Sequence, residues 1–225
     1  MNIIITGASK GIGYETALLF AKDKANRIVP ISRSGFSPGL TSIRHIAFDL
    51  QSSSDKYSST LLPLILKEFK FVDVLINNAG VLVNKTFEDL SPADWQYTYE
   101  TNVFVSAKLI KLLLPYMSRM SHIVNISSMG AVQGSTKFKG LSAYSSSKAA
   151  LANLTECLAE ELKDRNIAVN CLALGAVQTE MLQQAFPDYK APVDAKTMAE
   201  FIVEFSLNGH RYFNGKIIPV ALSTP

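Results

Sequence analysis

Short apolar segments rich in β-branched residues alternate with longer segments of helical period along the chain, and this alternation restricts the fold more than any other feature. The first segment, Asn2–Thr6, is apolar without interruption, as expected of a strand buried on both faces of a sheet. Further strands are expected at Arg27–Ile31, Ile43–Phe48, Val72–Ile76, His122–Ile126, Ile167–Leu172 and Gly215–Val220. Helices are expected between them at Ile12–Lys24, Ser54–Phe69, Pro92–Met117, Ala143–Lys163 and Ala195–Leu207.

A β-α-β order repeated in this way predicts an α/β fold with a parallel sheet and helices on both of its faces. No repeat, low-complexity tract or linker divides the sequence, so we expect one domain over residues 1–225. In such a sheet ligands bind outside the carboxyl ends of the strands. The residues that follow strands are therefore the ones to search for a site.

Composition and charge exclude several classes of protein. The 22 basic and 19 acidic residues give a net charge of +3, without the basic stripe of a nucleic-acid-binding protein. No apolar run has the length of a membrane span, and no basic segment of a signal peptide precedes the first strand, so we expect a cytoplasmic protein. We expect Cys157 and Cys171 to be buried thiols. His45, His122 and His210 lack metal-ligand spacing, and no metal is expected.

A glycine-rich loop follows the first strand, in the sequence Thr6–Gly13. Its glycines, Gly7, Gly11 and Gly13, have the spacing G-x-x-x-G-x-G. Glycine lets the backbone turn sharply and approach a pyrophosphate at the N-terminus of the next helix. With a strand before it and a helix after it, the loop predicts a dinucleotide-binding site.

Two other motifs overlap this loop. The P-loop spacing G-x-x-x-x-G-K-[ST] is not met. The segment Gly7–Gly11 does match G-x-S-x-G, so a serine hydrolase with Ser9 as nucleophile and His122 or His210 as base is an alternative. It would leave Gly13 unexplained, and no segment precedes the loop that could supply an oxyanion hole.

The end of the second predicted strand carries Ser32 and Arg33, and Arg33 lies twenty residues beyond Gly13. An acidic residue there would bind the ribose 2′-hydroxyl of NAD, whereas an arginine accommodates the 2′-phosphate of NADP. Lys10 adds a second cation near the same place. We therefore expect NADP(H) in preference to NAD(H).

Three further segments, each following its expected element, complete a family resemblance: Asn77–Gly80 (NNAG), Ile126–Ser128 (ISS) and Tyr144–Lys148 (YSSSK). Together with the glycine loop they resemble the classical short-chain dehydrogenase/reductase family over essentially the whole chain. The resemblance implies a Rossmann-type, doubly wound sheet of seven strands. It also implies hydride transfer between a nicotinamide cofactor and a small carbonyl or alcohol substrate, and a homodimer or homotetramer.

The resemblance also implies catalytic roles. Tyr144 would be the general acid/base, and Lys148, one helical turn further on, would lower the pKa of the phenol and bind the nicotinamide ribose. Ser128 would hold the substrate oxygen, and Asn102 would position a water in the proton relay. A non-catalytic NADP-binding regulator is disfavoured because binding alone does not require Tyr144 as an acid.

The expected cofactor contacts come from segments spread along the chain. They are implied by the glycine loop, by the second predicted strand and by the family resemblance. Val177, through its backbone, and the Thr179 hydroxyl would hold the nicotinamide carboxamide. The full expected set is Gly7, Ser9, Lys10, Gly11, Ile12, Gly13, Ser32, Arg33, Asp49, Leu50, Asn78, Ala79, Gly80, Tyr144, Lys148, Gly175, Val177 and Thr179.

The sequence departs from the family pattern in four places. Leu174 stands where a proline usually precedes Gly175, which should loosen one turn. The loop before Tyr144 is long and carries two lysines, the lid segment at 180–194 is short, and the tail at 221–225 lacks the usual Asp-Gly-Gly. A short lid predicts an open substrate cleft.

Overall fold

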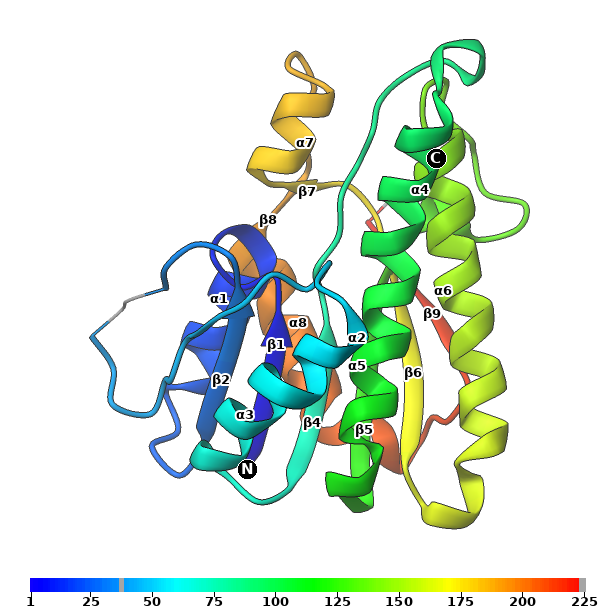
Figure 1. Cartoon of the computed structure of the whole chain (residues 1–225). Coiled ribbons are helices and arrows are strands. Elements are labelled where there is room, and N and C mark those ends of the chain that lie inside the picture. The colour runs from blue at the N-terminus through cyan, green and yellow to red at the C-terminus, as the bar shows by residue number, and fades with distance from the viewer. Residues whose placement is uncertain (37–38, 223–225) are drawn as a thin grey trace.

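Parallel strands form the centre of the computed structural model, which describes residues 1–36 and 39–222, with Arg119 described by its main chain alone (Figure 1). Within those residues the main sheet has seven strands in the order β3-β2-β1-β4-β5-β6-β9. They are β1 (Asn2–Thr6), β2 (Arg27–Ser32), β3 (Ile46–Ala47), β4 (Val72–Asn77), β5 (Met117–Ser128), β6 (Ala168–Leu174) and β9 (Ile217–Val220). The chain reverses its direction across the sheet between β1 and β4, which is the point where doubly wound sheets bind ligands.

Alternate side chains of β1 enter two separate hydrophobic cores, which explains why this strand is apolar throughout. Ile4 lies in the core beneath α3 (Leu62–Glu68) and α5 (Val105–Leu113). Ile3 and Ile5 lie in the core beneath α1 (Gly11–Phe20) and α8 (Ala195–Asn208). The remaining helices are α2 (Ser54–Lys56), α4 (Pro92–Tyr99), α6 (Ser142–Glu161) and α7 (Glu180–Ala185).

The predicted α/β class, with a parallel sheet and helices on both faces, is confirmed. The third strand is shorter than the predicted Ile43–Phe48, because at this sheet edge only Ile46 and Ala47 pair with β2, apart from one bridge between Ile28 and Ile43. π-helical turns at Tyr57–Leu61 and Glu100–Phe104 interrupt the two long helical regions. The short strands β7 (Val177–Gln178) and β8 (Val193–Asp194) pair beyond the carboxyl edge and flank α7.

The two thiols differ in environment. Cys171 is buried in β6 as expected, but the prediction for Cys157 is wrong, because this residue lies on the exposed side of α6. No helix in the described part of the chain has both the length and the apolar character needed to cross a membrane. Residues 223–225 of the tail lie outside the described residues.

His122 lies at the opposite end of the sheet from the glycine loop and is 1% exposed. Its Nδ1 donates to the Ser206 carbonyl at 3.0 Å, and its Nε2 accepts from Asn170 Nδ2 at 3.0 Å. Burial lowers the pKa of His122 from 6.5 to about 4. The neutral ring is therefore the form that the folded protein holds.

This burial predicts a pH-dependent stability. Because the pKa is lower in the folded than in the unfolded state, the unfolded chain takes up the proton first as the pH falls below 6.5. Between pH 6.5 and 4, His122 should lower the unfolding free energy by about 3 kcal/mol. Urea unfolding of His122→Gln across this range should show a flatter pH dependence than the wild type. Identical slopes for the two proteins would contradict this assignment.

Candidate active site

A cavity of about 970 Å³ runs along the carboxyl edge of the main sheet. It brings together most of the residues that the sequence predicted for cofactor and catalysis, from the glycine loop to the segment after β6. Gly13 and Asn102 are in the predicted set but do not line the cavity. The predicted residues that do line it are Gly7, Ser9, Lys10, Gly11, Ile12, Ser32, Arg33, Asp49, Leu50, Asn78, Ala79, Gly80, Ser128, Tyr144, Lys148, Gly175, Val177 and Thr179.

The glycine loop has the backbone geometry that its sequence predicts. Gly7 and Gly11 have φ angles of +66° and +59°, in the left-handed region that favours glycine. A Cβ atom on Gly7 would lie 2.7 Å from the Ala79 Cα, so the turn also requires glycine for space. These residues fit a pyrophosphate, because they leave bare backbone beside the N-terminus of α1.

The NNAG segment after β4 supports this loop from behind. Asn78 Nδ2 donates to the carbonyls of Thr6 and Gly7 at 3.0 and 3.1 Å. The amides of Asn78 and Ala79 both donate to Thr6 Oγ1 at 3.0 Å. A Cβ on Gly13 would lie 2.5 Å from Asn78 Nδ2. Gly13 therefore serves the packing of α1 against this segment.

The end of β2 lies at one end of the cavity. Arg33 is exposed and lines the cavity, and it has no ion-pair partner among residues 1–36 and 39–222. Ser32 Oγ donates to the Ser34 carbonyl at 2.8 Å, so its contact of 2.9 Å with His45 Nε2 needs the imidazole as donor. His45 thus supports the Ser32 side chain, a role that the scattered histidines of the sequence did not indicate.

Lys10 is already paired. Its ammonium forms an ion pair with Glu180 at the start of α7, and both side chains line the cavity. The two side chains are 56% and 63% exposed, so this pair contributes little to stability. Its importance is geometric, because it joins the glycine loop to the first turn of α7.

Tyr144 and Ser128 approach each other from α6 and the end of β5. Burial raises the pKa of the Tyr144 phenol, and a hydrogen bond with the Ser128 side chain acts in the opposite direction. Ser128 Oγ also accepts from the Gly130 amide at 3.2 Å, which fixes its position. The lowering of the Tyr144 pKa by Lys148 stays a prediction.

Lys148 is 4% exposed, and its Nζ donates to the Ile126 carbonyl at 2.8 Å. Ser127 Oγ donates to the Lys148 carbonyl at 2.9 Å, so the end of β5 holds both ends of this residue. Burial lowers the pKa of Lys148 from 10.5 to about 8. The pKa of an ammonium buried in this way responds strongly to any charge placed near it.

Asn102 occupies the middle of the second π-helical turn and is fully buried. Its Oδ1 accepts from the Val81 amide at 2.8 Å, and its Nδ2 donates to the Val81 carbonyl at 3.0 Å and to Ser147 Oγ at 2.9 Å. The side chain therefore fixes the segment after Gly80 to α6. It does not point into the cavity as a free polar group.

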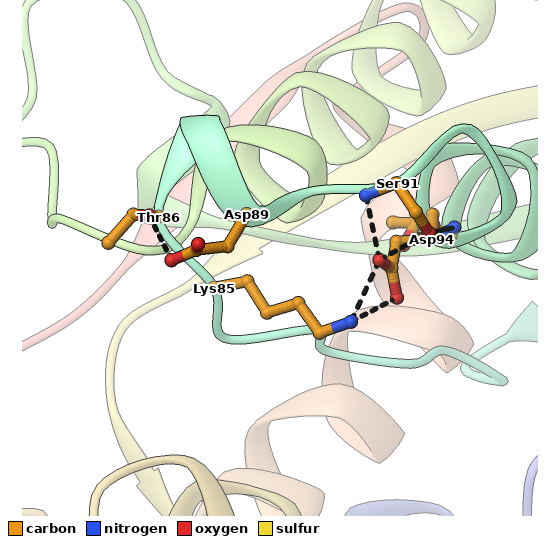
Figure 2. Close-up of polar contacts among 6 residues, drawn as sticks. Lys85, Thr86, Asp89, Ser91 and Asp94 are labelled. Carbon is orange, nitrogen blue, oxygen red and sulfur yellow. Dashed lines mark hydrogen bonds and ion pairs between the residues drawn. The ribbon is translucent and has the colours of Figure 1, made fainter.

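A polar network fixes the loop between β4 and α4, as Figure 2 shows. Lys85 Nζ bonds both carboxylate oxygens of Asp94, and Asp94 also forms a capping box with Ser91 at the start of α4. These contacts lower the pKa of Asp94 from 3.8 to about 2. The Lys85 amide donates to the Gly140 carbonyl at 3.1 Å, and Asn84 Nδ2 donates to the Ala185 carbonyl at 2.8 Å. The loop thereby joins the segment before α6 to α7.

The serine hydrolase alternative has no support in this arrangement. Ser9 lies at the carboxyl edge, whereas His122 pairs with Ala168 at the start of β6. Ser128 lies six positions beyond His122 along β5, which corresponds to roughly 20 Å. Both ring nitrogens of His122 already have hydrogen-bond partners, so neither is available as a base for Ser9. The His210 ring lies beside His122, with 5.7 Å between the two ring centroids.

Comparison with known proteins agrees with this geometry. The family model described as short chain dehydrogenase matches residues 1–190. The chain belongs to the short-chain dehydrogenase family. It is 28% identical to the 3-oxoacyl-[acyl-carrier-protein] reductase FabG of Chlamydia trachomatis, over 96% of this chain and 94% of that one. It is 35% identical to the 7alpha-hydroxysteroid dehydrogenase of Escherichia coli K12, over 80% of this chain and 72% of that one.

Solved structures of this short-chain dehydrogenase fold include ElxO with NADP bound. That structure has a TM-score of 0.83 and 26% identity, and the match covers 98% of this chain and 96% of that one. Other structures with the fold hold NADH. The comparisons therefore support an oxidoreductase that uses a nicotinamide cofactor.

Proposed function

We propose that this short-chain dehydrogenase is an NADP(H)-dependent carbonyl reductase or alcohol dehydrogenase acting on a small-molecule substrate. The observation that carries the proposal is the meeting of Ser128, Tyr144 and Lys148 in the same cavity as the glycine loop. The hydroxyls of Ser128 and Tyr144 can contact a carbonyl oxygen, and Lys148 provides a positive charge beside them. A regulator that only bound the cofactor would not need this arrangement.

The cofactor would supply or accept the hydride at the carbonyl carbon. On reduction, the Ser128 hydroxyl donates a hydrogen bond to the substrate oxygen, and Tyr144 transfers its phenolic proton to that oxygen. Lys148 binds the nicotinamide ribose, and its charge favours the tyrosinate that remains. Asn102 acts through position, because it fixes the backbone at Val81 against α6.

Arg33 supports the preference for NADP(H), because a guanidinium at the end of β2 that has no ion-pair partner in the described part of the chain suits a 2′-phosphate. In Arg33→Ala, the Kd for NADPH should rise by about 10-fold to 100-fold, which is the value of one or two hydrogen bonds to a charged group. The Kd for NADH should stay within about twofold, since NADH offers no such charge. Titration of cofactor fluorescence measures both constants.

The matched control is Lys22→Ala, which removes the same charge at an exposed position two residues beyond α1, away from the cavity. It should leave both affinities unchanged. Tighter binding of NADH than of NADPH by the wild type would overturn the NADP preference and leave the reaction class standing.

We also propose a homodimer or homotetramer in the cytoplasm. Tyr97 on α4 and Phe104 in the π-helical turn before α5 are 40% and 50% exposed, which suits a helical face covered by a second copy. Light scattering coupled to size-exclusion chromatography measures the assembly. A monomer at micromolar concentration would reject this part of the proposal.

A further inference from the structure

The walls of the cavity beyond Tyr144 are apolar. They come from the loop after β5 and from α7 with the residues that follow it. The side chains concerned are Met129, Leu141, Met181, Leu182 and Phe186. Pockets of this kind bind apolar groups and use a few polar atoms to orient them. Here Ser128 and Tyr144 are the polar groups at the reacting position.

The mouth of the cavity is also apolar. Phe138, Met181 and Tyr189 line it and are 50%, 38% and 48% exposed. Large side chains that remain exposed together at the rim of a cleft mark a surface that a ligand covers. The same apolar surface thus continues from the wall of the cavity to the outside.

Each charged side chain that lines the cavity either has a partner within the protein or lies far from Ser128. Lys10 and Glu180 pair with each other, and Lys148 donates to the Ile126 carbonyl. Arg33 and Asp49 follow β2 and β3, at the end of the cavity farthest along the sheet from Ser128. Within the described residues, these five are the charged side chains that line the cavity.

The lysines of the long loop before Tyr144 add no free positive charge to the cavity near Ser128. Lys137 Nζ donates to the Val132 carbonyl and to Ser135 Oγ, at 2.6 and 2.8 Å, so its charge is held by its own loop. Lys139 does not line the cavity. An anionic substrate would find no free cation beside Ser128 among the side chains described.

The apolar walls are held in place before any substrate arrives. Asn84 links the loop after β4 to α7, and Lys85 links it to Gly140 in the loop before α6. The exposed ion pair of Lys10 with Glu180 adds a weaker contact at the other end of α7. A rim fixed at several points favours a rigid ligand of matching shape over a flexible charged one.

We propose that the substrate is a bulky, uncharged, apolar ketone, or the corresponding secondary alcohol. Its fused or branched hydrocarbon part lies between the loop after β5 and α7, with its carbonyl oxygen at Ser128 and Tyr144. This inference rests on the proposed function. It narrows the substrate class of the same site from any carbonyl compound to one without a charge near the reacting carbon.

The test compares three ketones with NADPH as reductant: 1-decalone, cyclohexanone and 4-oxocyclohexanecarboxylate. The values of kcat/KM should be highest for decalone, at least about tenfold above cyclohexanone, because its second ring buries additional methylene groups. The carboxylate should be at least about tenfold below cyclohexanone, because the charge loses its hydration without a partner.

A variant makes the assignment specific to α7. Met181→Lys places a cation on the apolar wall at a partly exposed position, so folding should survive. The ratio of kcat/KM for decalone to that for the carboxylate should fall at least about tenfold. Tyr212→Lys adds the same charge before β9, at the other edge of the sheet, and should leave the ratio unchanged.

The outcomes separate the two proposals. If the wild type reduces the carboxylate as well as decalone, or if Met181→Lys leaves the ratio unchanged, the substrate class is overturned while the reaction class stands. If the protein binds NADPH but reduces none of the ketones, the proposed reaction itself is overturned, and the substrate class with it.

Discussion

Replacing Tyr144 by phenylalanine should lower kcat by about 10³-fold, within the range that general acid catalysis contributes. The change removes one oxygen atom and keeps the ring that packs at the start of α6. Ser128 would still hold the substrate oxygen, but no group at that position could release or accept the proton. The Kd for NADPH should change by less than about threefold, because the glycine loop and Arg33 are untouched. Stopped-flow or steady-state NADPH oxidation gives kcat, and fluorescence titration gives Kd.

The matched control is Tyr116→Phe, the same change just before β5 at the opposite edge of the sheet. It should retain wild-type kcat. Retention of more than a tenth of the activity by Tyr144→Phe would remove this residue as the acid. A loss of NADPH binding of the same size would instead indicate a role in holding the cofactor.

A single methyl group at Gly13 should affect the cofactor site although Gly13 does not line it. The added Cβ would lie 2.5 Å from Asn78 Nδ2 and 2.7 Å from the Gly7 carbonyl, so the loop must shift. We expect Gly13→Ala to lower the unfolding free energy by about 1–3 kcal/mol, the usual cost of overpacking. The Kd for NADPH should rise by about 100-fold or more, because several loop hydrogen bonds to the pyrophosphate are displaced together.

Gly35→Ala is the matched control, because nothing lies within 4 Å of the Cβ position at Gly35 and neither glycine needs a left-handed backbone. That variant should match the wild type in urea unfolding and in NADPH titration. If Gly13→Ala also matches the wild type, the contact between Asn78 and the glycine loop does not determine cofactor binding.

Much of the fold could be predicted because the central strands carry runs of buried β-branched residues, most clearly β1, which is buried on both faces. Asn2–Thr6 was predicted with its observed bounds for this reason. The edge strand β3 was overestimated, since Ile43, Ile46 and Phe48 are buried as in a strand but the segment pairs with a neighbour on one side only. Strand β5 begins five residues before the predicted His122, where Met117 still pairs with Val72 across a register shift.

Part of the candidate site could also be predicted from the sequence, and part could not. Residues at or just after the ends of strands, such as Ser128 and Arg33, were found because the topology brings strand ends to one edge. Contacts between side chains distant in sequence could not be predicted. The partner of Lys10 is 170 residues away at Glu180. His45 supports Ser32 through a pairing that depends on how the loop before β3 turns.

The last strand has a consequence for how the protein becomes active during its synthesis. The Gly175 amide donates to the Val220 carbonyl at 2.9 Å, and Gly175 lies against Ala221, so β9 holds the segment that would contact the nicotinamide. A ribosome makes β9, and Ala221 and Leu222 that line the cavity beside it, after the other described parts of the site. The growing chain can therefore fold its glycine loop early, yet it should gain cofactor affinity only once residues near 220 have left the exit tunnel. Ribosome-bound chains stalled before and after that point would show the difference in NADPH binding.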